Sequence, residues 1–249
     1  MGMENQISAN QANDGRLVVP YDKGRKNITF YDTFVDINGD VIKYDDIAVI
    51  QASALNSSSM IYFYFDRSFR YEFNFTTYDG KVHKFKRHGY SGYGIGTYKR
   101  IKAEFEVVAP PFYRIVVRSV GERLIDRIAN GATANICGLV ITKDKITYTK
   151  RKKEYVIDRS NFDRAVNNNA YMSNMVQIYI RDEKKPIFKC SLNEPNARLI
   201  VPIVNYFFEY RANPASVPAA ADPNVNPYMP PVVEETSSKA KAAPVDDDE

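Results

Sequence analysis

A run of strand-like segments ends in a helix-like segment, and the same order then recurs along the chain. The first pass covers residues 28–129 and the second pass covers residues 138–211. This duplication predicts two small α+β units, since a sheet with one apolar face must bury that face against another element. A repeated fold presents binding surfaces more often than it builds one reaction centre.

The clearest strand signal lies in the first pass. Every second residue of Phe69–Phe75 is aromatic and the residues between them are polar, which is typical of a strand with one buried face. Asp79-Gly80 follows and tolerates positive φ, so residues 69–87 predict a β-hairpin. Further strands are expected at Ile28–Ile37, Val41–Ile50 and Met60–Phe65, with a turn at Asn38-Gly39.

Helical periodicity follows the strands in both passes. Apolar residues recur at three- and four-residue steps from Tyr98 to Ile128, and Asn130-Gly131 is a plausible stop. Pro110-Pro111 predicts a kink or a second helix, because proline lacks an amide donor. The second pass predicts strands at Leu139–Tyr148, Tyr155–Val166, Val176–Arg181 and Ile187–Leu192. Its closing helix carries an apolar stripe that consists of Leu199, Ile200, Ile203, Val204, Phe207 and Phe208.

Composition agrees with a globular chain. Hydrophobic residues make up 44% and aromatic residues 13% of the 249 residues, which suffices for two packed cores. Cys137 and Cys190 lie far apart in sequence, so we expect buried thiols in a reducing compartment rather than a disulfide framework or a zinc site. No apolar run resembles a secretory signal or the roughly 20 residues of a membrane span. A cytoplasmic protein is expected.

Residues 213–249 differ in composition from the rest of the chain. They hold seven of the 13 prolines and a formal charge of −5, which leaves +9 for the remainder of a chain whose net charge is +4. Such a segment buries too little apolar surface to fold. It is either a solubilising extension or a segment that docks on a partner or on the basic body. Tyr228 and Met229, which lie among prolines, are the candidate docking residues.

These shifts in composition divide the chain into four parts. Residues 1–26 are expected to be disordered, residues 27–131 form the first domain with its long helix, and residues 132–212 form the second domain. Residues 213–249 form a disordered Pro/Ala-rich acidic tail.

The sequence contains no recognisable catalytic motif. His83 and His88 are the only histidines, and their spacing along a strand turns them to opposite faces, so two exposed basic residues are expected rather than a metal pair. The glycine-rich segment 92–99 lacks the spacing of either phosphate-binding fingerprint and is interpreted as a connection from sheet to helix. We therefore expect no enzyme activity, no metal and no cofactor.

Residues 98–208 resemble an uncharacterised family with tandem pleckstrin-homology-like (PH-like) domains. The resemblance rests on a helix with Tyr98, Arg100 and Glu106, on Gly138–Asp144, Tyr155–Val166 and Pro195-Asn196, and in the first pass on Tyr44–Ile47. It implies two tandem PH-like domains, each a strongly bent antiparallel sheet capped by a C-terminal helix, and no catalytic residues. The chain departs from the pattern by having no tryptophan and by carrying a basic hairpin in its second pass.

Two basic clusters are candidate surfaces for an anion or a protein partner. The candidates from the first pass are Lys84, Lys86, Arg87, Lys99 and Arg100, and those from the second pass are Lys150, Arg151, Lys152 and Lys153. The PH-like resemblance implies that the second cluster is placed like the basic first hairpin of headgroup-binding domains. We expect a non-catalytic scaffold that binds a protein partner or self-assembles. Peripheral binding to anionic membrane is the alternative, and nucleic acid is disfavoured because the aromatic residues alternate as core strands.

Overall fold

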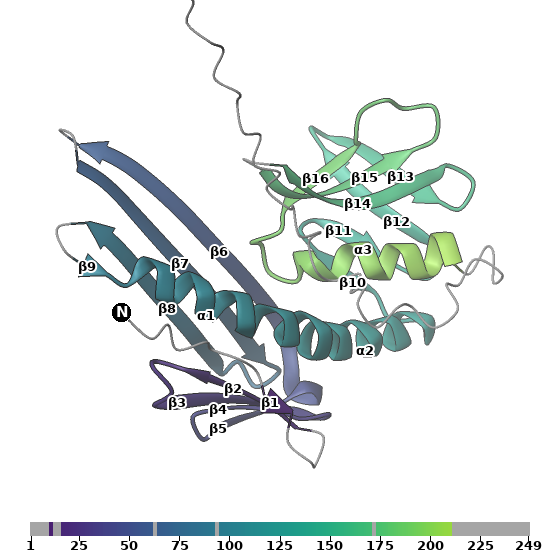
Figure 1. Cartoon of the computed structure of the whole chain (residues 1–249). Helices are drawn as coiled ribbons and strands as arrows, with labels where there is room; N and C mark the ends of the chain where they lie inside the picture. The colour runs from purple at the N-terminus through teal and green to yellow at the C-terminus, as the bar shows by residue number, and fades with distance from the viewer. Residues whose placement is uncertain (1–9, 12–15, 62–63, 93–94, 171–172, 211–249) are drawn as a thin grey trace, which may run out of the picture.

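The structure is a computed structural model that describes residues 10–11, 16–61, 64–92, 95–170 and 173–210. Its fold is α+β, with several open antiparallel sheets packed against helices (Figure 1). Among the described segments, no helix combines the length and the apolar character needed to cross a membrane.

The first pass builds two antiparallel sheets that a 3₁₀ turn at Tyr44–Asp46 connects. The strands of one sheet, in spatial order, are β1 (Asn10–Gln11), β2 (Leu17–Tyr21), β3 (Lys26–Phe30), β4 (Phe34–Ile37) and β5 (Asp40–Lys43). The strands of the other are β6 (Ile47–Ile61), β7 (Tyr64–Thr77), β8 (Val82–Gly92) and β9 (Ile95–Gly96).

The second of these sheets is a long ribbon. β6 has 15 residues and β7 has 14, and together with β8 they extend away from the second pass (Figure 1). The predicted hairpin at residues 69–87 is confirmed, because β7 pairs with β8 and Gly80 occupies the turn at φ 84°. The side chains of Phe69, Tyr71, Phe73 and Phe75 are all buried.

One long helical segment follows the ribbon in sequence and covers one of its two faces. It comprises α1 (Tyr98–Pro111), a π-helical stretch (Phe112–Val117) and α2 (Arg118–Ala129). The prolines therefore change the helix without ending it, since the π-helical stretch begins directly after the two missing amide donors. The predicted stop is confirmed, with Gly131 at φ 95° and the Asn130 amide donating to the Asp126 carbonyl at 3.0 Å.

The second pass repeats this order in shorter elements. One sheet contains β10 (Ala134–Ile136), β11 (Leu139–Ile141), β12 (Lys145–Lys150) and β13 (Lys153–Asp158). The other contains β14 (Phe162–Ala170), β15 (Ser173–Ile180) and β16 (Phe188–Ser191). The closing helix α3 (Ala197–Asn205) continues into a π-helical stretch (Tyr206–Tyr210). Every residue of its predicted apolar stripe is buried.

Several expected boundaries are wrong. Residues 17–26, expected to be disordered, form β2 and the start of β3, because Val19 and Tyr21 are buried and alternate with less buried neighbours. The expected strand at 60–65 spans two strands, since Ile61 ends β6 and Tyr64 begins β7. The expected strands at 28–37, 41–50, 139–148 and 155–166 are each divided by a turn. These turns, at 31–33, 44–46, 142–144 and 159–161, are mainly polar but only three residues long, and they contain no glycine or proline, so the expected strands ran through them.

The two passes meet at the start of β6. The Ile50 amide donates to Asn196 Oδ1 at 2.8 Å, and the Asn196 amide donates to the Ile50 carbonyl at 2.8 Å. Gln51 Nε2 donates to the Asn193 carbonyl at 2.7 Å. The loop before α3 thus occupies one short section of the β6 edge.

Candidate docking edges and basic clusters

Among the strands that the structure describes, none pairs with the outer edge of β8 over most of its length. β9 pairs with β8 only at Ser91 and Gly92, and the Thr97 amide donates to the Tyr90 carbonyl at 2.9 Å. In an antiparallel sheet, alternate residues direct both backbone groups to the same side. The backbone carbonyl of Tyr90 points away from β7. By this alternation, the backbone groups of Val82, Lys84, Lys86 and His88 also point to this edge.

The opposite edge of the same sheet belongs to β6. Ile50 directs its amide and carbonyl to Asn196, so by the same alternation Ala52 and Ala54 direct theirs outward. No strand among the described residues pairs with β6 there. The ribbon therefore has two open edges, and unpaired edges are templates for another extended chain.

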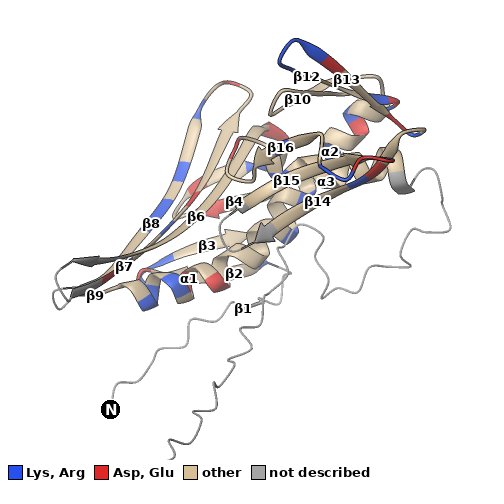
Figure 2. Cartoon of the chain, turned by 90° about the horizontal axis from the view of Figure 1, so that it is seen from above, with Lys and Arg blue, Asp and Glu red and all other residues tan. Residues whose placement is uncertain are grey.

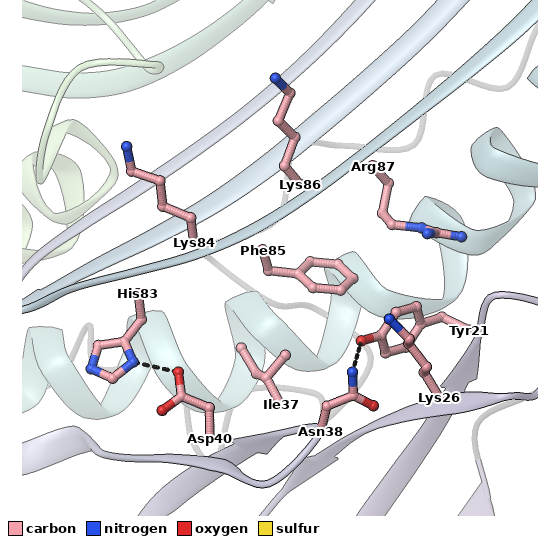
Figure 3. Close-up of a pocket in the computed structure, with 10 residues that line it drawn as sticks. All are labelled: Tyr21, Lys26, Ile37, Asn38, Asp40, His83, Lys84, Phe85, Lys86 and Arg87. Atoms are coloured by element: carbon pink, nitrogen blue, oxygen red, sulfur yellow. Dashed lines mark hydrogen bonds and ion pairs between the residues drawn. The ribbon is translucent and has the colours of Figure 1, made fainter.

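A groove of about 280 Å³ lies between β8 and the first sheet. His83, Phe85 and Arg87 point from β8 toward that sheet, whereas Lys84 and Lys86 point away from it (Figure 3). The sheet contributes Ile37, Asn38 and Asp40 as well as Tyr21 and Lys26. Two polar contacts border the groove, from Asn38 Nδ2 to the Tyr21 hydroxyl at 2.8 Å and between His83 Nδ1 and Asp40 Oδ2 at 2.6 Å.

Arg87 belongs to a buried ionic network rather than to the exposed basic surface. Its Nε donates to Oε1 of Glu104 at 2.7 Å, and the Glu104 side chain is fully buried. The Tyr71 hydroxyl donates to the same oxygen at 2.7 Å, and Asp22 Oδ1 lies 3.4 Å from Arg87. Burial is the main cause that raises the pKa of the Tyr71 hydroxyl, with Glu104 adding to the effect. The network ties β8 to α1 and to the turn after β2.

The first predicted basic cluster therefore separates into three parts. Lys84 and Lys86 are exposed on the outer face of β8, while Arg87 faces inward. Arg100 lies 3.9 Å from Asp22 Oδ1, the carboxylate oxygen that Arg87 also contacts, so these two arginines belong together, whereas Lys99 is exposed in the first turn of α1. Sequence proximity suggested one patch, but the strand alternation and the start of α1 turn the side chains to different sides.

The second cluster is a compact hairpin tip. Lys150 pairs with Lys153 across a two-residue turn, and Arg151 and Lys152 occupy that turn at φ 51° and 67°. All four residues are exposed, and Figure 2 shows their charge at the tip joining β12 to β13. The tip connects the third and fourth strands of the pass, whereas the first hairpin turns at Cys137-Gly138. The expected placement in a first hairpin is therefore wrong.

The histidines differ from their expected setting in one respect. Their side chains do face opposite sides of β8, and His88 is exposed as predicted. His83 is buried instead, with Asp40 as its partner. Within the described part of the chain, no group of three or more His, Cys, Asp or Glu residues is arranged to hold a metal ion.

Sequence reasoning missed a contact between the two thiols. An interaction with the Cys190 thiol lowers the pKa of the Cys137 thiol, and the same interaction together with burial raises the pKa of Cys190. The Cys190 thiol itself donates to the Ser191 carbonyl at 3.3 Å, and the Cys137 thiol donates to the Pro195 carbonyl at 3.9 Å. The two residues are 53 positions apart, at the β10–β11 turn and in β16, so no local sequence pattern predicts that they interact. The tail candidates Tyr228 and Met229 lie outside the described residues.

No protein-family model matches the chain, and no curated protein matches it significantly.

Proposed function

We propose that the protein is a non-catalytic interaction or scaffold protein, built from two tandem PH-like units at residues 27–131 and 132–212, that binds a protein partner through its open strand edges. The observation that carries the proposal is the β6–β8 ribbon, which has two unpaired edges in the described structure. Edge strands left open in this way bind extended segments by backbone pairing. Self-assembly through the same edges is the related outcome.

The order of elements supports the PH-like part of the proposal. Each pass has a meander of short strands, a second antiparallel sheet and a closing helix, in the same sequence order. This is the order that the family resemblance implies, although each pass has separate sheets rather than one continuous bent sheet.

The test captures partners by crosslinking in extract of the source cells, using the full chain and the variant Ala54→Pro. Ala54 directs its amide to the open β6 edge, so proline there removes an edge donor while leaving the pairing with β7 intact. We expect a specific protein that the intact chain captures and the variant loses, followed by direct binding of the purified pair. Equal capture by both chains, or turnover of a specific substrate by the purified protein, would contradict the proposal.

A second candidate function is peripheral binding to an anionic membrane surface through the tip at residues 150–153. The turn conformation favours it, because positive φ at two successive residues normally selects Asn-Gly. The corresponding turn of the first pass is Asn38-Gly39, at φ 58° and 89°. The second pass instead places Arg151 and Lys152 there, between two further lysines. Strain tolerated at such positions is typical of functional sites.

Sedimentation with vesicles of phosphatidylserine and phosphatidylcholine tests this candidate. Replacing Arg151→Asn and Lys152→Gly keeps a favourable turn and removes two charges, each worth about 1 kcal/mol near an anionic surface, so vesicle affinity should fall roughly 30-fold. Lys84→Glu with Lys86→Glu is the control and should retain more binding. Binding that is insensitive to salt or to the tip substitutions would exclude this mode.

A further inference from the structure

We infer that the acidic segment 232–236 of this chain adds to the outer edge of β8 as an extended strand and covers the groove beneath it. The inference goes beyond the proposed function, because it assigns an intramolecular occupant to one of the two open edges.

The β8 edge offers both backbone pairing and positive charge. The backbone groups of Lys84, Lys86 and His88 face the edge, and the three side chains are exposed on the outer face of the sheet. Lys84 lies opposite Asn74, and Lys86 lies opposite Glu72, which already pairs with Arg70 at 2.6 Å. A strand added here would therefore meet two lysines that form no salt bridge with another described residue, while the charge of Lys86 acts on Glu72 across the strand pair.

The chain contains one segment in its last part that fits this edge. Residues 232–236 read Val-Val-Glu-Glu-Thr and contain no proline, unlike the segment immediately before them. β-Branched residues favour extended structure, and proline cannot take part in a strand pairing on both sides. The segment also belongs to the acidic part of the chain, whose charge is opposite to that of the body.

In an added strand, the side chains of the segment would alternate between the two faces of the sheet, and each face offers them complementary groups. With Glu234 on the outer face, beside Lys84 and Lys86, Val233 and Glu235 turn toward the groove. Phe85 supplies an apolar surface there, and Lys26 supplies a cation. The acidic side chains thus meet lysines on both faces, and the valine meets the aromatic ring.

The connection is long enough for this arrangement. Residues 211–231 separate the end of the last helical stretch from the segment, and an extended chain of that length spans up to about 70 Å. The longest helical segment, from α1 to the end of α2, has a length of about 48 Å. The longest strand, β6, has 15 residues and a length of about 50 Å, so the tether exceeds both the longest helical segment and the longest strand.

The experiment measures hydrogen exchange of individual backbone amides by NMR in the full chain and in the full-length variant Glu234→Lys, Glu235→Lys. We expect the amides of Lys84, Lys86 and His88 to exchange at least ten times faster in the variant. The amides of Phe85 and Arg87 pair with β7 and serve as the internal reference, since their exchange should be unchanged. The matched control Asp247→Lys, Asp248→Lys alters the tail charge equally and should retain the protection.

Three results would overturn the inference. The first is equal exchange at the edge amides in the full chain and the Glu234/Glu235 variant, and the second is an equal loss of protection in the control variant. The third is protection that increases with protein concentration, which would assign the edge to the segment of a second copy. Failure here leaves the β6 edge and its Ala54→Pro test untouched, so the two proposals fail separately.

Discussion

The two passes share an order of elements but stabilise their cores differently. The first pass encloses Glu104, fully buried, together with Arg87, whose side chain is 19% exposed. In the second pass the described core is apolar apart from Gln177. Among the described residues, every buried acidic or basic side chain belongs to the first pass.

This difference follows from the lengths of the elements. In the first pass, the long ribbon packs against a helix and the turn after β2. The charged network connects all three, because Glu104 of α1 accepts hydrogen bonds from the ribbon and from the Asp22 amide. The short strands of the second pass need only the apolar stripe of α3. A charged network makes the arrangement specific but is vulnerable to loss of one member, whereas an apolar core loses stability in proportion to the surface removed.

Removing Glu104 should give the largest effect. Glu104→Leu leaves Arg87, in a largely buried site, with only its longer ionic contact to Asp22 at 3.4 Å, and the free energy of unfolding should fall by about 3–5 kcal/mol. Urea unfolding measures the change. The double variant Arg87→Met, Glu104→Leu should regain most of the loss, because no uncompensated charge remains.

The control for this prediction lies on the same helix. Glu106 is 63% exposed and has only a 4.0 Å contact with Lys102, so Glu106→Leu should change the unfolding free energy by less than about 0.5 kcal/mol. If Glu104→Leu and Glu106→Leu were equally mild, the buried network would not stabilise the first pass and the contrast between the passes would disappear.

The close approach of α1 to β8 gives the second prediction. A Cβ at Gly89 would lie 2.8 Å from the Thr97 carbonyl oxygen and 2.8 Å from Ile101 Cβ, so Gly89→Ala must displace the start of the helix. We expect a loss of about 1–3 kcal/mol in thermal or urea unfolding.

Gly96 provides the matched control, because no heavy atom lies within 4 Å of a Cβ built there. Gly96→Ala should be within about 0.5 kcal/mol of the unaltered chain. Similar losses at both positions would show that the helix does not press on β8 in the way that the geometry requires.

The elements could be predicted from sequence where one local pattern determines them. The alternation of aromatic residues in β7 and the stripe of α3 are periodic signals, and backbone conformation marks the end of β7 at Asp79-Gly80 and the end of α2 at Asn130-Gly131. The turns that divide the strands at 28–37 and 155–166 are Tyr-Asp-Thr and Arg-Ser-Asn, which are only three residues long and contain no glycine or proline, so the strand signals on both sides merge. The strand β2 was missed because its alternation is short and lies near a polar segment.

The candidate site could be predicted only in part, because its decisive contacts join distant residues. Arg87 and Lys86 are neighbours in sequence, but only the pairing of β8 shows that one faces Glu104 and the other faces outward. The open edges depend on which strands pair, and this is a property of the whole sheet. The basic tip was visible as a run of charges, whereas its position in the pass required the division of β11 from β12.

Exchanging the two matching turns tests whether backbone conformation determines their stability. Replacing Arg151-Lys152 by Asn-Gly removes unfavourable backbone conformations and should stabilise the second pass by about 1 kcal/mol. The reciprocal change, Asn38→Arg with Gly39→Lys, should destabilise the first pass by about the same amount. Urea unfolding of both variants measures the effect, and two changes of the same sign would mean that the surroundings of each turn, not its backbone conformation, determine turn stability.

The smallest expected effect concerns the thiols of the second pass. Because the interaction with the Cys190 thiol favours the thiolate of Cys137, the pKa of Cys137 is lowered and its thiolate persists to lower pH than that of an ordinary thiol. The rate of Cys137 alkylation by iodoacetamide, followed by mass spectrometry, should therefore rise at lower pH than for a free cysteine, with Cys190 modified much later. Cys190→Ala removes the interacting thiol and should move the pH profile of Cys137 alkylation to higher pH. The unfolding midpoint should remain nearly unchanged. Cys190→Val, which fills the buried site and also lacks the thiol, should move the pH profile equally. A profile that neither substitution shifts would show that the thiols do not interact, and the β10–β11 turn would then be linked to β16 by packing alone.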